Sequence, residues 1–195
     1  MNVKVCRQER EMKNKAVFLD RDGTINIDKV YLYKPEEFEF IDGAVEGLKI
    51  LSDLGYILIV VTNQSGIARG YYTEEDCEKL NNFMADELKK YGVEIKKSYY
   101  CPHHPEKGIG KYKTECNCRK PNPGMILEGI KEFNIDVENS YIVGDKLSDA
   151  EAGMKAGIQG VVVQTGLEPV TFTEKNVLLY SSLYEFAEDL RKKQK

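Results

Sequence analysis

The sequence has no tryptophan, no apolar run as long as a membrane-spanning helix, and no excess of positive charge. The missing apolar run argues against a membrane protein built from helices. The formal net charge of −4 argues against a nucleic-acid-binding surface, because such surfaces need clustered lysine and arginine. Residues 1–15 are charged and lack the apolar core of a signal peptide. We therefore expect a cytoplasmic protein whose partners are neither membranes nor nucleic acids.

The sequence also lacks internal repeats, low-complexity segments and a recognisable linker. Its 195 residues are enough for one domain with a sizeable core. We expect a single domain over residues 15–195, a loose arm at residues 1–14, and a monomer.

Short apolar runs alternate along the chain with segments that have helical spacing. The runs predict buried strands at 16–20, 56–63, 97–101, 140–145, 160–165 and 176–180. Helices are predicted at 42–55, 73–92, 122–134 and 181–195. The second should begin at Thr73, and the third should have Asn122 as its cap and Pro123 at its first position. Such alternation predicts an α/β fold, with a mostly parallel sheet covered by helices on both faces.

Polar residues gather where the predicted strands end. Asp20 and Asp22 follow the first strand, Thr62 and Asn63 end the second, and Asp145 follows the fourth. In an open α/β sheet the active crevice lies at these ends. Oxygen ligands suit Mg²⁺, so we expect the ion at Asp20, at Asp145 and at a backbone carbonyl near Asp22. One carboxylate could then attack phosphorus while the other transfers protons.

Two other interpretations of Asp20 and Asp22 are open on these residues alone. The pair, beside Gly23, can simply cap a turn. It can also be a fragment of a calcium-binding EF-hand loop, but the later acidic ligands and the closing glutamate of that loop are missing.

Four segments occur in order along the chain: FLDRDGTIN, VVTNQSGIARG, CRKPNPGM and VGDKLSDAEAG. Together they resemble the four motifs of the haloacid dehalogenase (HAD) superfamily of phosphohydrolases. The resemblance implies a Rossmann-like HAD fold in which Asp20 is the nucleophile and Asp22 the general acid/base. It also implies that Thr62 and Lys120 stabilise the phosphoryl group and that Asp145 holds Mg²⁺.

Three of the five cysteines lie in one short region. Cys101 and His103 are two residues apart, as are Cys116 and Cys118, and in extended backbone this spacing puts both members of a pair on one face. Two such pairs can close a tetrahedral Cys₃His site with no position left for water, so a zinc ion there would be structural. The alternative is a set of free cysteines beside a proline-rich turn.

The remaining candidate ligands are less well placed. His104 would point away from the cluster if its segment is extended. Cys6 and Cys77 have no partner at useful spacing and are expected to be free thiols.

Further segments, among them LDRDGTINID, YYCPHHP and CNCRKPNPGM, extend the resemblance. They are similar to the heptose bisphosphate phosphatase family, a HAD group with a zinc loop and no separate cap domain, over about residues 16–166. The resemblance implies hydrolysis of the C7 phosphate of D-glycero-D-manno-heptose 1,7-bisphosphate, a step toward the activated heptose of surface polysaccharide. The implied cofactors are Mg²⁺ and Zn²⁺.

The same resemblance assigns residues to roles. The zinc ligands are Cys101, His103, Cys116 and Cys118. The substrate contacts are Asp28, Lys29, Val30, Tyr31, Thr62, Asn63, Gln64, Ser65, Arg119, Lys120 and Lys146. Arg119 is the recognition residue, and its guanidinium can grip a second phosphate in two-pronged fashion. Lys146 could instead be a spectator paired with an acid, and Asp149 either orders a metal-bound water or caps a helix.

Two alternatives to this function stay open. A histidinol-phosphate phosphatase would have the same metal sites but handles one phosphate, so it has less need of a second anion clamp. A non-catalytic, zinc-stabilised binding module would not need a complete set of catalytic positions, and here every position is filled.

Overall fold

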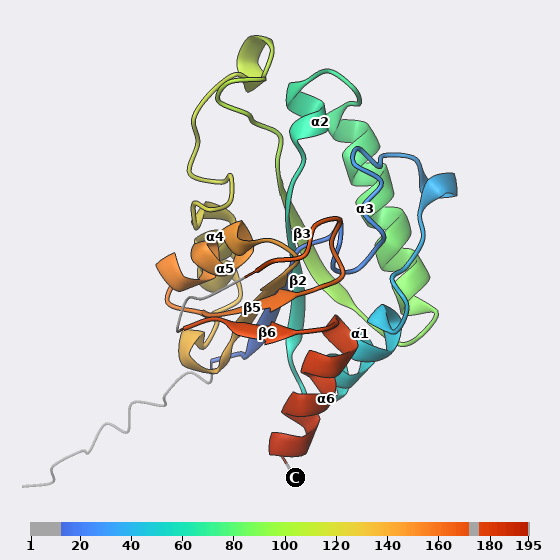
Figure 1. Ribbon diagram of the computed structural model, residues 1–195, viewed down its shortest axis with the longest axis vertical. Coiled ribbons are helices and arrows are strands. Elements are labelled where there is room, and N and C mark those ends of the chain that lie inside the picture. Colours follow the sequence, from blue (N-terminus) through green and yellow to red (C-terminus); the bar gives the residue numbers. More distant parts are fainter. Residues whose placement is uncertain (1–12, 172–175, 195) are drawn as a thin grey trace, which may run out of the picture.

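The structure is a computed structural model, and it describes residues 13–171 and 176–194. Within these residues six strands form one sheet in the order β3-β2-β1-β4-β5-β6, and every neighbouring pair is parallel (Figure 1). The strands are β1 Ala16–Leu19, β2 Ile57–Asn63, β3 Ile95–Cys101, β4 Tyr141–Gly144, β5 Gln159–Val163 and β6 Leu178–Tyr180. The six predicted strands and their parallel arrangement are confirmed.

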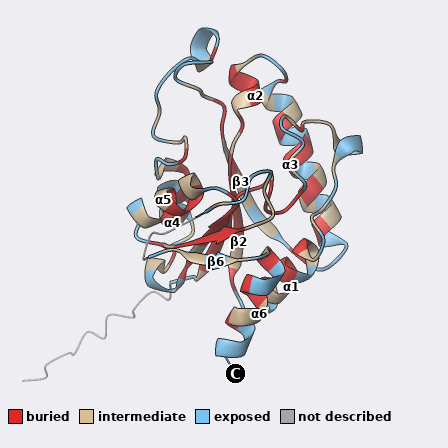
Figure 2. Cartoon of the chain, in the orientation of Figure 1, coloured by how far each residue is buried: buried red, intermediate tan, exposed pale blue. Residues whose placement is uncertain are grey.

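Helices pack on both faces of the sheet, as predicted. They are α1 Ala44–Asp53, α2 Ser65–Ala68, α3 Glu74–Lys89, α4 Gly124–Glu132, α5 Leu147–Lys155 and α6 Leu183–Lys193. The strand β1 is buried throughout, because its side chains alternate between two cores. Figure 2 shows that the middle of the sheet is largely buried, whereas the helices around it have exposed residues. Val17 and Leu19 join the core formed with α1, α3 and α6, whereas Ala16 and Phe18 join the core formed with α4 and α5.

Two predicted helix starts have different outcomes. Thr73 does cap α3: its hydroxyl accepts from the Asp76 backbone N–H at 3.1 Å, and Asp76 Oδ2 accepts from the Thr73 N–H at 2.9 Å. The predicted cap of α4 is wrong by one residue, because that helix begins after Pro123 as its N-cap. The Asn122 amide is occupied elsewhere, since it donates to the Cys116 carbonyl at 2.9 Å.

The start of the chain falls partly outside the described residues. Residues 1–12, which include Cys6 and most of the expected arm, are not described. Asn14 is held against the domain: its N–H donates to the Asn134 carbonyl at 3.0 Å, and its carbonyl accepts from the Asp136 N–H at 2.7 Å. Among the described helices, none combines the length and the apolar character needed to cross a membrane.

Parallel strands bring distant segments together at their carboxyl ends. Asp20 follows β1, Asp145 follows β4, and β1 pairs with β4. On the other side of β1, β2 ends in Asn63, and β3 beyond it ends in Cys101. The residues singled out in the sequence therefore lie along one edge of the sheet.

Candidate active site

Three buried carboxylates meet at the end of β1 and β4. One oxygen from each of Asp20, Asp145 and Asp149 lies within 4.8 Å of the others. Their exposed fractions are 6%, 2% and 1%, so water screens their repulsion poorly. The structure brings together the predicted ligands Asp20 and Asp145, and α5 adds Asp149 from its first turn.

Lys120 supplies positive charge to this cluster. Its Nζ lies 2.9 Å from Asp20 Oδ1 and 2.6 Å from Asp149 Oδ1, and it donates to the Val61 carbonyl at 2.6 Å. Burial by itself lowers the pKa of Lys120, but Asp149 and Asp20 outweigh it and raise that pKa. Asp149 Oδ2 also accepts from the Lys146 N–H at 3.0 Å, so Asp149 caps α5 while it holds Lys120.

Asp145 keeps a carboxylate oxygen without a partner. Its Oδ1 is buried and has no hydrogen bond among the described residues. Burial, and then the charge of Asp20, raise the pKa of Asp145 to about 7. Two glycines leave room beside it: a Cβ at Gly23 would lie 2.6 Å from Asp145 Oδ2, and one at Gly166 would lie 2.3 Å from it. An unpartnered oxygen among buried carboxylates is the donor set that a hard cation such as Mg²⁺ fits.

Asp22 points to a different set of partners. Its carboxylate accepts from the Arg21 guanidinium at 2.9 Å, from Asn26 Nδ2 at 3.0 Å and from Gln64 Nε2 at 3.0 Å. Burial would raise the pKa of Asp22, but the Arg21 charge and these hydrogen bonds hold that pKa below its ordinary value. The side chain of Asp22 is thus an ionised group outside the cluster of Asp20, Asp145 and Asp149.

Arg21 is a residue that the sequence reasoning missed. It is fully buried, and its guanidinium also donates to Asn81 Oδ1 at 3.0 Å and to the Leu32 carbonyl at 3.3 Å. A buried arginine needs such partners, because an unpaired buried charge is strongly unfavourable. In the sequence, this role could have been inferred from the position of Arg21, between two aspartates and directly after a predicted buried strand.

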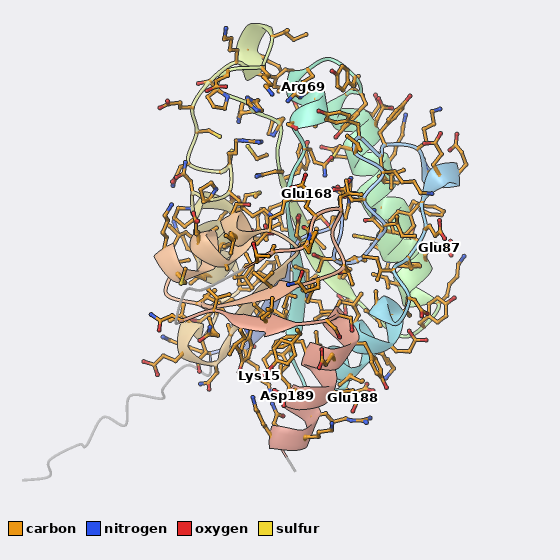
Figure 3. All side chains as sticks on the ribbon, viewed as in Figure 1. Lys15, Arg69, Glu87, Glu168, Glu188 and Asp189 are labelled. Atoms are coloured by element: carbon orange, nitrogen blue, oxygen red, sulfur yellow. The ribbon has the colours of Figure 1, made fainter. Side chains whose placement is uncertain are left out.

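A cavity of about 640 Å³ opens beside Asp145. Its walls contain five of the predicted substrate contacts, namely Asp28, Val30, Tyr31, Ser65 and Lys146. The Lys146 Nζ lies 3.4 Å from both Asp28 Oδ2 and Asp145 Oδ2, so it is paired with acids and also faces the cavity. The other wall is formed by residues 167–171, which follow β5. This segment contains no recognisable motif, and its Glu168 is labelled in Figure 3.

Three predicted substrate contacts are directed elsewhere. Lys29 Nζ donates to the Glu37 carbonyl at 2.7 Å. The Asn63 amide is bonded to the backbone N–H and carbonyl of Lys120, both at 3.0 Å. Gln64 is buried and bonded to Thr62 as well as to Asp22. Asn63 and Gln64 thus connect other residues of the site to one another, whereas Lys29 bonds to the exposed segment around Glu37.

The predicted zinc ligands also converge. Cys118 Sγ lies 3.2 Å from Cys101 Sγ and 3.1 Å from Cys116 Sγ, and His103 Nδ1 lies 3.5 Å from Cys118 Sγ. These sulfur atoms are too far apart for disulfides, and all three cysteines are free. One nitrogen and three sulfurs within 4.8 Å of one another match the ligand set of a structural zinc ion. The Cys/His cluster is therefore present.

The neighbouring candidates do not join this cluster. His104 Nδ1 accepts from the backbone N–H groups of Glu106 and Lys107 at 3.2 and 3.1 Å, so it turns away as expected. Cys77 is a free, buried thiol on α3 that packs in a separate small core with Ile67 and Tyr72.

Residues 101–118, from the last residue of β3 onward, form the predicted zinc loop, which reaches α3. Its Tyr112 hydroxyl donates to Glu74 Oε1 at 2.6 Å, and the Ile109 N–H donates to the Ala68 carbonyl at 2.8 Å. At the other end of the loop, the Arg119 guanidinium donates to the His103 carbonyl at 3.2 Å and lines a cavity of about 310 Å³ together with Lys120.

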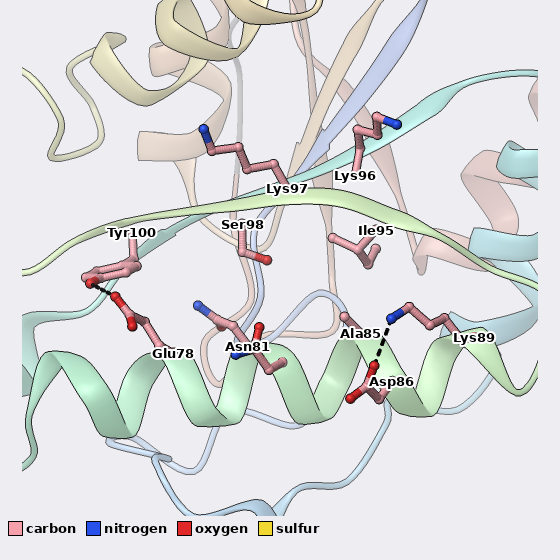
Figure 4. Close-up of a pocket in the computed structure, with 11 residues that line it drawn as sticks. Glu78, Asn81, Ala85, Asp86, Lys89, Ile95, Lys96, Lys97, Ser98 and Tyr100 are labelled. Atoms are coloured by element: carbon pink, nitrogen blue, oxygen red, sulfur yellow. Dashed lines mark hydrogen bonds and ion pairs between the residues drawn. The ribbon is translucent and has the colours of Figure 1, made fainter.

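A further cavity, of about 600 Å³, lies between α3 and the edge strand β3 (Figure 4). Asn81, Lys96, Ser98 and Tyr100 are among its walls. Its lining contains none of the described residues predicted for the site, so this cavity is not the predicted active site.

Comparison with known proteins agrees with this geometry. The family model described as "HAD-hyrolase-like" matches residues 117–190. A Pasteurella multocida protein named D-glycero-beta-D-manno-heptose-1,7-bisphosphate 7-phosphatase is 52% identical over 158 residues, which are 80% of this chain and 85% of the relative. The Escherichia coli K12 protein of the same name is 43% identical over 183 residues, 92% of this chain and 95% of the relative.

The chain belongs to the D-glycero-β-D-manno-heptose-1,7-bisphosphate 7-phosphatase family. Among solved structures, the D,D-heptose 1,7-bisphosphate phosphatase from B. bronchiseptica, in complex with magnesium and phosphate, superposes with a TM-score of 0.80. Its sequence is 30% identical, and the match covers 92% of this chain and 99% of that one. Membership of this family confirms the HAD-like fold and makes the chain a phosphatase. The alternative of a non-catalytic binding module is set aside.

Proposed function

We propose that this phosphatase removes the C7 phosphate of D-glycero-D-manno-heptose 1,7-bisphosphate through an aspartyl-phosphate on Asp20. The names of the relatives support the substrate, and the magnesium and phosphate bound to the B. bronchiseptica enzyme support the chemistry. The observation that carries the proposal is the meeting of the Asp20 and Asp145 carboxylates, because Asp145 also lines the cavity. In this proposal the product feeds the synthesis of activated heptose for surface polysaccharide, and the enzyme acts in the cytoplasm.

Asp20 and Lys120 act together on the phosphoryl group in this proposal. The carboxylate of Asp20 attacks phosphorus and becomes phosphorylated. Lys120, 2.9 Å from it, offsets the negative charge that gathers as the phosphoryl group is transferred. Mg²⁺, held by Asp20, Asp145 and the backbone carbonyl of Asp22, would add positive charge at the same place.

Asp22 transfers the protons. The structure presents it as a carboxylate, the form that takes a proton from water when the aspartyl-phosphate is hydrolysed. To protonate the sugar oxygen in the first step it must gain a proton, and the negative charge of an arriving phosphate raises a neighbouring pKa in the required direction.

The zinc loop serves recognition in this proposal. Cys118 lies directly before Arg119 and Lys120, so a zinc-clamped loop fixes the position of both cations. Lys120 belongs to the reacting centre, and Arg119 is left to bind the second phosphate.

The substitution Asp20→Asn tests the covalent step. The change keeps the shape of the side chain and removes the nucleophile, so we expect kcat to fall at least about a thousandfold while the thermal unfolding curve stays cooperative. Steady-state hydrolysis and circular dichroism measure the two quantities. Unaltered turnover by the folded variant would contradict the mechanism.

A substrate comparison tests the specificity separately. The kcat/KM for heptose 1,7-bisphosphate should exceed that for histidinol phosphate, because histidinol phosphate offers no second phosphate to Arg119. A clear preference for histidinol phosphate would overturn the substrate while leaving the covalent mechanism intact.

A further inference from the structure

The side chain of Gln64 is enclosed by protein at the heart of the site. It is 2% exposed and does not line the cavity beside Asp145. Its Nε2 donates to Asp22 Oδ2 at 3.0 Å and to Thr62 Oγ1 at 2.8 Å. An amide nitrogen carries two hydrogens, so both are used within the protein.

Tyr72 decides which way this amide faces. Its hydroxyl donates to Gln64 Oε1 at 2.5 Å, so the amide oxygen points to Tyr72 and the amide nitrogen points to Asp22 and Thr62. Burial raises the pKa of Tyr72, which keeps its hydroxyl protonated and a donor. Tyr72 is itself 7% exposed, and its ring stacks on Tyr33 at 5.3 Å between centroids.

The orientation of Gln64 has consequences for two reacting groups. Since Thr62 Oγ1 already accepts from Gln64, the hydroxyl hydrogen of Thr62 must be directed to another acceptor. Gln64 and the Arg21 guanidinium both donate to the same oxygen of Asp22, Oδ2, and so fix the position of the carboxylate. A reversed amide would turn an oxygen toward this carboxylate and repel it.

We propose that Gln64, held in one orientation by Tyr72, is a positioning residue that fixes the Asp22 carboxylate and turns the Thr62 hydroxyl toward the phosphoryl group. The inference rests on the proposed function, because it assumes that Asp22 and Thr62 act on the substrate. This role differs from the direct contact with substrate that the sequence predicts for Gln64.

The test compares the steady-state kcat and KM of Tyr72→Phe and Gln64→Glu with those of wild type, using p-nitrophenyl phosphate at one fixed pH. Tyr72→Phe keeps the buried ring and frees the amide to rotate, so we expect kcat to fall about tenfold with KM changed less than about twofold. Gln64→Glu replaces the amide nitrogen that donates to Asp22 and Thr62 with a carboxylate oxygen, so kcat should again fall while KM changes little. Tyr33→Phe, the matched control, removes a neighbouring hydroxyl and should behave as wild type.

Each outcome separates the alternatives. A raised KM at unchanged kcat in either variant would make Gln64 a substrate contact and overturn the inference, as would an unchanged kcat in Tyr72→Phe. If Gln64→Glu fails to fold, Tyr72→Phe alone decides. Asp22→Asn distinguishes the two levels: full activity in that variant refutes the proton-transfer role of Asp22 in the proposed function, on which the inference rests. If Asp22→Asn is inactive while Tyr72→Phe matches wild type, only the positioning inference is wrong.

Discussion

At the scale of single residues, the buried carboxylate of Asp145 is stabilised by a positive charge beside it, either a proton or a metal ion. Its folded-state pKa of about 7 lies above the ordinary value of 3.8, so the folded protein holds this proton more tightly than the unfolded chain. The stabilisation from the proton is complete below 3.8 and is lost as the pH rises through about 7. Ionised Asp145 therefore costs stability until a cation replaces the proton.

Magnesium binding should consequently depend on pH. Protons compete with the ion for Asp145, so the Kd for Mg²⁺ should rise by up to about tenfold for each pH unit below the pKa of that residue. Calorimetric titration of the metal-free protein with Mg²⁺ between about pH 6 and pH 8 measures this. Asp145→Asn is the control and should bind Mg²⁺ weakly at every pH. A Kd that does not change with pH in the wild-type protein would contradict the assignment.

At the scale of elements, the zinc loop connects parts of the molecule that are separate in sequence. Its ligands lie at the end of β3 and just before α4, while Tyr112 joins it to Glu74 at the start of α3. A loop of this length has little apolar surface to bury, so its order depends on these few connections. Metal at the Cys/His cluster would then contribute directly to the stability of the loop.

We therefore expect Cys116→Ser to lose zinc and to unfold at a lower temperature. A loss of roughly 3 kcal/mol would lower the Tm by about 10 °C in a domain of this size. Metal analysis and thermal denaturation measure the two effects. His104→Ala changes a histidine outside the cluster, so it should keep its zinc. Retention of zinc and of the wild-type Tm in Cys116→Ser would exclude a zinc clamp.

At the scale of the whole molecule, most of the architecture could be predicted from local patterns. Apolar runs located the strands, and their parallel order placed Asp20 and Asp145 at one edge. The bonds from Arg21 to Asn81 and from Tyr72 to Gln64 could not be predicted in this way, because each joins side chains that are not neighbours in the sequence. The wall at 167–171 was missed for a related reason: a loop without regular spacing gives no local signal of what it faces.

Recognition of a bisphosphate also belongs to the whole molecule, since the zinc loop and the sheet edge must both be in place. Arg119→Ala should lower kcat/KM for the bisphosphate by roughly tenfold or more, because it removes a charge-assisted hydrogen bond to the second phosphate. Hydrolysis of a small monophosphate should change little. Lys113→Ala removes a charge from the same loop without lining the described cavities, and it should leave both rates unchanged. Equal losses for both substrates in Arg119→Ala would contradict the role.

The two glycines that leave room for Asp145 tie together segments from opposite ends of the chain. Gly23 follows the first strand and Gly166 follows the fifth, yet a methyl group at either position would collide with the same carboxylate. A substitution at either glycine during evolution must therefore be compatible with the side chain of Asp145. A chimera that joins the first half of one homologue to the second half of another keeps its acidic centre only when both parents supply a glycine.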